Sequence, residues 1–453
     1  MKVSIKSIAF AAFALSAGQT HAAVSAQEAQ QLGSSLTPWG AEKAGNAQGT
    51  IPAYTGTAKA PASYDPKKPG IHPDPFSEDE PLYTISAGNM ATYSKQLSAG
   101  VQEMLRRYPG YKLNIYPTRR NANYAQWVND NSIKNATQCK TINDGNGVEG
   151  CIGGVPFPIP KTGNEVMWNR LLQFDAPSVE GTINVWLVDG AGKQIHQGED
   201  QIRVEIPYYD RTKTKMEPGE IYWRWYHVAT APARVAGEAL MMHDSLDMVN
   251  IGRRAWQYLP GQRRTKLSPD LAYDTPAPQS GGSFNMDDNL LFLGAMDRFD
   301  WKLVGKQEMF IPYNNYKVKD QVQCPYSKLL SRNYIEPECT RWELHRVWVV
   351  EATIKPGVRH NYHKRVFYLD EDVFSGLADN YDAAGKIYRT VQQFPTSRYE
   401  AEGNDNSFTV YHDLSTGSYA FTVGPSASGT TYATPPKDPR FWSPESLAGR
   451  GIR

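Results

Sequence analysis

The segment RWELHRVWVVEATIKPGVRHNYHKRVFYL, residues 341–369, decides the fold most clearly. Two runs rich in β-branched and aromatic residues, Arg341 to Ile354 and Arg359 to Leu369, lie on either side of Lys355-Pro356-Gly357. Residues of these types favour strands, and a short Pro-Gly turn between two such runs predicts a β-hairpin.

The same pattern extends from residue 175 to the end of the chain. Turn signals such as Asp189-Gly190 and Pro260-Gly261 separate short runs of strand-forming residues. The other strands are predicted at 182–188, 201–208, 220–228, 255–259, 263–267, 301–304 and 309–312, with further turns at 381–385 and 415–417. So many antiparallel strands in succession favour one large, strongly curved sheet or an open barrel.

Helical periodicity is found mostly in the part of the chain before these strands. Helices are predicted at 25–33, at 89–108 with an interruption at Gly100, at 122–137, and at 163–174, where Val166, Met167, Arg170 and Leu171 have helical spacing. Helices followed by a long series of strands define an α+β class in which β structure dominates.

A segment rich in Gly, Pro, Ala and Thr, residues 36–81, has little periodicity. Its aromatic residues Trp39, Tyr54 and Tyr64 would be exposed in a free linker, so we expect an ordered arm that lies across the β part. The predicted organisation is a leader at 1–22, an N-terminal helix and arm at 23–81, a helical segment at 82–174, and a β region at 175–453.

The first residues have the features of a cleavable export signal. Lys2 and Lys6 precede an apolar run from Ile8 to Ala17, and small residues lead to a cleavage site after Ala22. No cysteine lies near that site, which argues against a lipid anchor, and no later stretch reaches the roughly 18 apolar residues of a membrane span. These features predict a soluble periplasmic protein.

The four cysteines fit an oxidising compartment. Cys139 and Cys151 lie in one polar, loop-like segment, and Cys324 and Cys339 lie in another. Three pairings are possible, and we favour Cys139–Cys151 and Cys324–Cys339. A zinc site is the alternative, but the sequence has no CxxC or nearby CxxH spacing.

Catalytic signatures are weak. The sequence has no GxSxG, P-loop, HExxH or GxGxxG motif. His360 and His363 are three residues apart, so on a strand their side chains point to opposite faces and cannot form a metal pair. Both are interpreted as surface residues. Asp370-Glu371-Asp372 is interpreted as a solvated strand end rather than a calcium site, and Asp287-Asp288 as a cap before a helix at 290–293. We therefore expect no catalytic residue, metal or cofactor.

Aromatic pairs supply the candidate ligand-binding residues. Lys and Arg number 48 against 47 Asp and Glu, so no basic excess points to nucleic acid. Because side chains alternate along a strand, Trp223 and Trp225 share one face, as do Trp256 and Tyr258. Ordinary sheet packing would explain either pair. The functional alternative is that all four line an apolar cavity in a half-barrel.

Several motifs together resemble a known family. They are LTPWGAE (36–42), YPTRR (116–120), RAWQYLPGQR (254–263), RFDWKLVG (298–305), HRVWVVE (345–351) and LAGRGIR (447–453). The chain is similar, over nearly its whole mature length, to the proteobacterial "domain of unknown function 1329" proteins, loosely called outer-membrane lipoprotein-sorting proteins.

The resemblance implies a fold similar to the LolA/LolB carriers, which is a half-open antiparallel barrel with an apolar cavity. It also implies that the gene lies near genes of RND-type exporters. The resemblance implies no catalytic residue. The function predicted is a periplasmic carrier or accessory protein that binds a hydrophobic, lipid-like molecule and works with an RND-type exporter or the outer membrane. A structural adaptor without cargo is the alternative, and a periplasmic hydrolase is a third.

Overall fold

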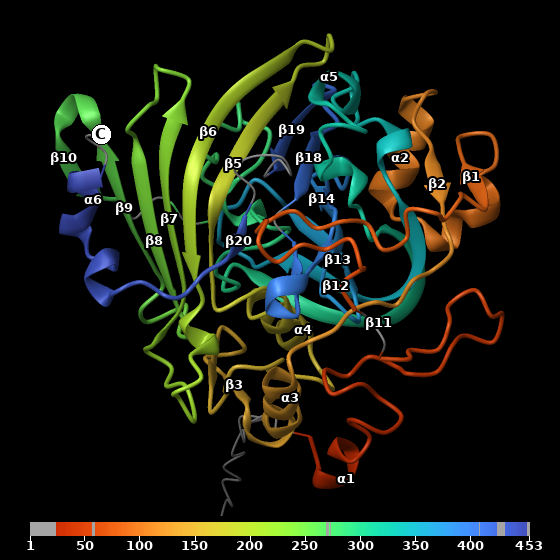
Figure 1. The fold of residues 1–453 in the computed structure, drawn as a ribbon, viewed down its shortest axis with the longest axis horizontal. Coiled ribbons are helices and arrows are strands. Elements are labelled where there is room, and N and C mark those ends of the chain that lie inside the picture. Colours follow the sequence, from red (N-terminus) through yellow and green to blue (C-terminus); the bar gives the residue numbers. More distant parts are fainter. Residues whose placement is uncertain are drawn as a thin grey trace, which may run out of the picture.

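One sheet of sixteen strands dominates the described part of the chain. The computed structural model describes residues 24–56, 59–268, 271, 273–406, 408–423 and 431–450 (Figure 1). The predicted leader at 1–22 lies outside these residues. No helix in the described ranges is both long and apolar enough to cross a membrane.

The strands of the large sheet are β1 (Tyr83–Ile85), β2 (Leu113–Ile115), β5 (Ser178–Val188), β6 (Gln194–Glu205), β7 (Ile221–Ala231), β8 (Ala239–Ser245), β9 (Arg253–Leu259), β10 (Arg264–Leu267), β11 (Phe299–Pro312), β12 (Trp342–Ile354), β13 (Lys364–Asp370), β14 (Gly376–Tyr381), β15 (Ile387–Gln393), β18 (Thr409–Asp413), β19 (Ser418–Val423) and β20 (Tyr432–Ala433). Two small hairpins pair β3 (Lys140–Ile142) with β4 (Gly147–Glu149) and β16 (Thr396–Arg398) with β17 (Gly403–Asp405).

The helices are few and short. They are α1 (Ala26–Ala29), α2 (Ala99–Arg107), α3 (Gln126–Gln138), α4 (Gly163–Leu171), α5 (Tyr326–Leu329) and α6 (Pro444–Arg450). Short 3-10 helices are η1 (Met90–Gln96), η2 (Pro207–Tyr209), η3 (Pro260–Gln262), η4 (Met286–Asp288), η5 (Lys317–Lys319), η6 (Pro337–Cys339), η7 (Tyr399–Ala401) and η8 (Pro439–Trp442). The predicted β-dominant α+β class is confirmed.

The sheet runs β1-β2-β12-β13-β14-β15-β18-β19-β5-β6-β7-β8-β9-β10, with β11 beside β12 and β20 beside β5. It is not closed into a barrel, because no pairing joins its first and last strands among the described residues. Pairing is antiparallel except for one parallel contact of β2 with β12. Bulges between β5 and β6, β6 and β7, and β7 and β8 help to bend the sheet. Figure 1 shows β5 to β10 with α6 on their outer side and α3 and α4 below.

The predicted hairpin at 341–369 is confirmed as β12–β13, and the predicted turns at 381–385 and 415–417 join β14 to β15 and β18 to β19. One prediction at 301–312 is wrong. Instead of two short strands, β11 is continuous and pairs with β12 along its whole length. The interruption read from the sequence is a bulge, a register shift between Leu303 and Gly305, which bends a strand without ending it.

The predicted helix at 89–108 divides before Gly100, not at it. Ser98 caps α2 by accepting a hydrogen bond from the Val101 amide. Gly100 lies in the first turn, and its amide donates to Asp379 Oδ2 at 2.9 Å. A Cβ at this position would lie 2.2 Å from Asp379 Oδ1, so glycine permits the close packing of α2 on the sheet.

Both favoured disulfides, Cys139–Cys151 and Cys324–Cys339, are present. Each closes a short loop and leaves no free cysteine. A disulfide stabilises a protein mainly by restricting the unfolded chain. One bridge closes the loop after α3 and the other closes the loop around α5, and all four cysteines are buried in the hydrophobic core clusters.

The N-terminal arm lies against the β part (Figure 1). Trp39 is 2% exposed, and its ring packs edge-on against Tyr54 and Tyr124 at 5.4 and 4.9 Å. Trp39 Nε1 donates to Asp372 Oδ1 at 3.3 Å. Tyr64 contacts Tyr399, with ring centres 5.1 Å apart. The aromatic residues thus join the arm to the sheet and its loops.

This packing predicts resistance to limited proteolysis. Trypsin cleavage after Lys43, which follows the buried Trp39 and Ala41, should be as slow as cleavage within the sheet, because the chain there must detach before it fits a protease. Peptide mapping of a short digest measures this. Rapid cutting throughout the arm, with the remainder intact and equally stable, would show a free tail.

Candidate functional site: an apolar cavity on the sheet

A cavity of about 160 Å³ lies against β5, β6, β7 and β8. The strands contribute mainly apolar side chains to its lining: Val179, Ile183, Val185, Ile202, Val204, Trp223, Trp225, Leu240 and Met242. The segment between β10 and β11 covers it with Ala277, Pro278, Phe284, Met286, Leu290, Phe292 and Leu293. The combination of a curved sheet and a covering loop therefore produces a largely apolar compartment.

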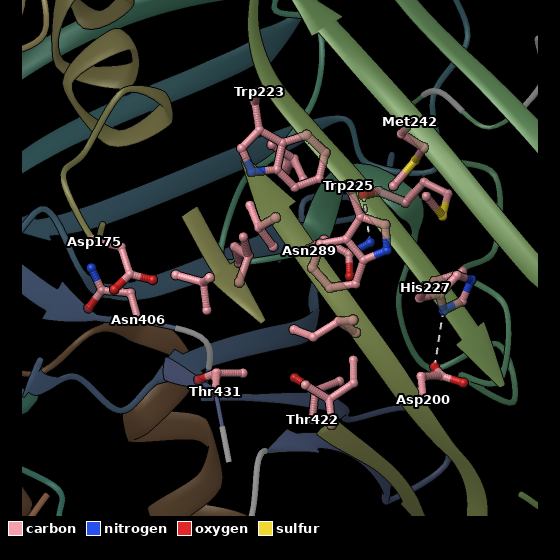
Figure 2. Close-up of a pocket in the computed structure, with 18 of the residues that line it drawn as sticks. Asp175, Asp200, Trp223, Trp225, His227, Met242, Asn289, Asn406, Thr422 and Thr431 are labelled. Atoms are coloured by element: carbon pink, nitrogen blue, oxygen red, sulfur yellow. Dashed lines mark hydrogen bonds and ion pairs between the residues drawn. The ribbon is translucent and has the colours of Figure 1, made fainter. Parts of the chain in front are cut away.

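Trp223 and Trp225 form the aromatic side of this cavity. Alternation along β7 points Trp223, Trp225 and His227 to the same face, as Figure 2 shows. The two indole rings are stacked with centres 5.8 Å apart. Trp223 is 5% exposed, and Trp225 is partly exposed. Both tryptophans line the cavity, as expected from the sequence. Ligand binding by these two residues stays a prediction.

Trp256 and Tyr258 do not line the cavity, which corrects their expected place. In the observed register Trp225 pairs with Met242 and Met242 pairs with Ala255. Ala255 therefore lies on the cavity face of β9, and Trp256 and Tyr258 point to the opposite face. There they pack in a separate cluster with residues such as Tyr226, Met241, Trp442 and Leu447.

Polar groups stand at two ends of the cavity (Figure 2). At one end His227 Nδ1 lies 3.1 Å from Asp200 Oδ2, and Gln279 Nε2 donates to Asp200 Oδ1 at 3.2 Å. At the other end Asp175 pairs with the fully buried Arg398. Burial raises the pKa of Asp175 to about 6, although Arg398 opposes that shift. Both carboxylates thus have partners already.

Arg170 on α4 is the one cavity residue whose charge has no partner in the described chain. Its side chain is 3% exposed, and neither Nε nor Nη2 has a hydrogen-bond acceptor among the described residues. Burial lowers its pKa to about 9. In the sequence, Arg170 stands out only by its helical spacing with Val166 and Met167. An arginine on the apolar face of a helix was the available signal.

The acidic triplet Asp370-Glu371-Asp372 is buried, so its interpretation as a solvated strand end is wrong. Arg120 Nε lies 2.9 Å from Asp372 Oδ2, and Lys306 Nζ lies 2.7 Å from Glu371 Oε2. His345, Asp370 and Asp372 have ligand atoms within 4.8 Å of one another. These atoms already have partners within the protein. His345 contacts Asp370 and Glu343, and Asp372 accepts hydrogen bonds from Arg120 and Trp39. The group is an ion network of the core.

Asp287 and Asp288 are also buried, and no helix follows them at 290–293. Asp288 does cap η4 together with Asn285, as expected of a capping carboxylate. Both carboxylates also bind Arg365, at 2.8 and 2.7 Å. His360, expected at the surface, is buried and lies 2.9 Å from Asp287, whereas His363 is exposed. This cluster fixes the cavity-covering segment onto β13.

The fold and the cavity define a class: β-dominant proteins in which an open, curved sheet bears an apolar cavity closed by loops and helices. The chain belongs to the family described as "Protein of unknown function (DUF1329)", whose model matches residues 84–448. This confirms the resemblance drawn from the motifs. An uncharacterized protein of Pseudomonas aeruginosa is 39% identical over 415 residues, 90% of each chain.

Two solved structures are similar over part of the chain. A DUF1329 family protein from Desulfovibrio piger has a TM-score of 0.42 at 12% identity and covers 63% of this chain and 97% of that one. A LolA superfamily protein from Nitrosomonas europaea has a TM-score of 0.37 at 11% identity and covers 63% of this chain and 98% of that one.

Proposed function

We propose that this protein is a non-enzymatic periplasmic carrier that binds a hydrophobic, lipid-like molecule in the cavity beside Trp223 and Trp225. The observation that carries the proposal is the apolar cavity itself, held by four strands and covered by the segment before β11. Concave, mostly apolar sites with few polar groups are typical of small-molecule binding.

The periplasmic location is supported by the signal-like start of the sequence and by the pairing of all four cysteines, because disulfides persist in oxidising compartments. The proposed partners are an inner-membrane RND-type exporter or an outer-membrane protein, to or from which the carrier would pass its cargo. That partnership rests on the family resemblance of the motifs.

The cavity volume limits what can be enclosed without rearrangement. About 160 Å³ is close to the roughly 150 Å³ of a cavity that holds benzene. The space therefore fits a ring or a short acyl segment, and each enclosed methylene contributes roughly 0.8 kcal/mol. We expect affinity to rise with chain length and then level off when the cavity is full.

The test is displacement of the neutral fluorescent probe N-phenyl-1-naphthylamine from delipidated protein by straight-chain alcohols. Affinity should increase roughly fourfold for each added methylene, the equivalent of that transfer energy, before it levels off. Trp225→Gln should weaken probe binding about tenfold, because a polar amide replaces an apolar ring that lines the cavity.

Trp256→Gln is the matched control. Trp256 is also a partly exposed tryptophan, only two strands away, but it packs on the opposite face of the sheet. This variant should bind the probe as the wild type does. If delipidated wild-type protein binds no neutral probe, the carrier proposal fails and the structural adaptor replaces it.

A further inference from the structure

Arg170 brings a guanidinium with no ion-pair partner among the described residues to the wall of the cavity. The Nε–H and one Nη2–H of a guanidinium point the same way and match the two oxygens of a carboxylate. In Arg170 both of these nitrogens are enclosed and lack an acceptor among the described residues. The residue lines the cavity from α4, next to Leu171.

Other arginines of this chain use the same edge for a carboxylate. Arg253 Nε and Nη2 each donate to Asp244 at 2.7 Å. Arg120 Nε and Nη2 donate to the two oxygens of Asp372 at 2.9 and 3.0 Å. Both are buried or nearly so, as Arg170 is. Arg170 therefore differs from them in lacking the anion, not in its burial.

The surroundings of Arg170 supply no internal anion in the described ranges. Asp175 is held by Arg398, and Asp200 by His227 and Gln279. The nearby polar groups that affect Arg170 are the phenols Tyr411 and Tyr222, and the buried Tyr222 Oη also has no hydrogen-bond partner. Since burial raises the pKa of Tyr222 well above its usual value, this phenol stays protonated and is a second donor.

A buried guanidinium without a counter-ion is costly to a folded protein, because it has lost water without gaining a partner. With a pKa of about 9, Arg170 keeps its charge at neutral pH despite this cost. A ligand that brings an oxyanion to this guanidinium lowers the penalty, so the cavity discriminates by charge as well as by apolar fit.

We propose that the cargo is an anionic amphiphile: its carboxylate or phosphate head pairs with the guanidinium of Arg170, and its apolar part lies against Trp223 and Trp225. This inference rests on the proposed carrier function and adds the chemical class of the cargo. It names one binding residue, Arg170, that no sequence motif marks.

The experiment compares decanoate, decyl phosphate and uncharged methyl decanoate as competitors of N-phenyl-1-naphthylamine at pH 7. Wild-type protein should bind at least one of the two anions ten times or more tightly than the ester. Arg170→Met keeps the length of the side chain and removes its charge. In this variant the anion and the ester should bind equally, with ester affinity within about twofold of the wild type.

Arg224→Met is the matched control, because Arg224 lies on β7 but stands over Trp442 on the other side of the sheet. It removes one positive charge from a strand that lines the cavity, but on the opposite face, and should keep the preference for the anion. Arg170→Lys, which retains the charge without the forked edge, should keep only part of that preference.

The outcomes separate the two proposals. If all three competitors bind the wild type equally, the anionic cargo is overturned and the hydrophobic carrier stands. If Arg170→Met keeps the full preference, Arg170 is not the binding residue and the inference is overturned. If no competitor displaces the probe, both proposals fail. The wild-type comparison alone decides the ligand class, whatever the stability of the variants.

Discussion

Arg365→Met is expected to lower the free energy of unfolding by about 4 kcal/mol. Arg365 on β13 is fully buried, and its Nη1 and Nη2 bind Asp287 and Asp288 at 2.8 and 2.7 Å. Its Nε donates to Asn380 Oδ1 at 3.0 Å. Removing the cation leaves two buried carboxylates with their charge uncompensated, which costs far more than the loss of an exposed ion pair.

Urea denaturation followed by tryptophan fluorescence measures this loss. Arg440→Met is the control: Arg440 pairs with Asp438 at 2.9 Å, but its side chain is 91% exposed. That variant should unfold at the wild-type midpoint. An Arg365→Met protein within about 1 kcal/mol of the wild type would contradict the role assigned to the cluster. Because η4 carries the cavity residue Met286, the same variant should also weaken probe binding.

Alkaline pH should remove about 3 kcal/mol of stability through His345 alone. Burial by itself would lower the pKa of His345, but hydrogen bonds to Asp370 and Glu343 overcome it and raise the pKa to about 9. The ordinary value is 6.5. The folded state therefore binds this proton more tightly than the unfolded state. The stabilisation is complete below about pH 6.5 and is lost as the pH rises through 9.

The measurement is the free energy of unfolding of the wild type and of His345→Gln between pH 6 and 10. Glutamine can hydrogen-bond but cannot titrate, so the difference between the two proteins should shrink by about 3 kcal/mol across this range. Titrating groups that do not contact His345 affect both proteins alike and cancel in the difference. Parallel pH profiles would mean that His345 does not carry the charge assigned to it.

The hairpins were predictable because their information is local. Lys355-Pro356-Gly357 joins two runs of strand-forming residues, and β12 and β13 pair on either side of it. The strand β11 was misread for the same reason. A bulge near Gly305 looks, in sequence, like the end of a strand, and only the pairing with β12 shows that the strand continues.

The cavity was half predictable. Alternation along β7 places Trp223 and Trp225 together, and that follows from strand geometry alone. The same rule pairs Trp256 with Tyr258, but it does not say which face of β9 aligns with which face of β7. A shift of one residue in register reverses every side chain. The observed alignment of Trp225, Met242 and Ala255 puts Ala255 and Gln257, not Trp256 and Tyr258, on the same face as Leu240 and Met242.

The sequence by itself determined the β-dominant class, the local hairpins, the family and the two disulfides, because turns, strand propensities and short motifs act over a few neighbouring residues. Only the tertiary structure decided which charges are buried and which are paired. Asp370, Asp287 and His360 appear in sequence as surface groups, yet residues remote in the chain surround them. Arg170 is the converse case: no carboxylate reaches it from any described element, and a missing partner becomes visible only when all of its neighbours in space are known.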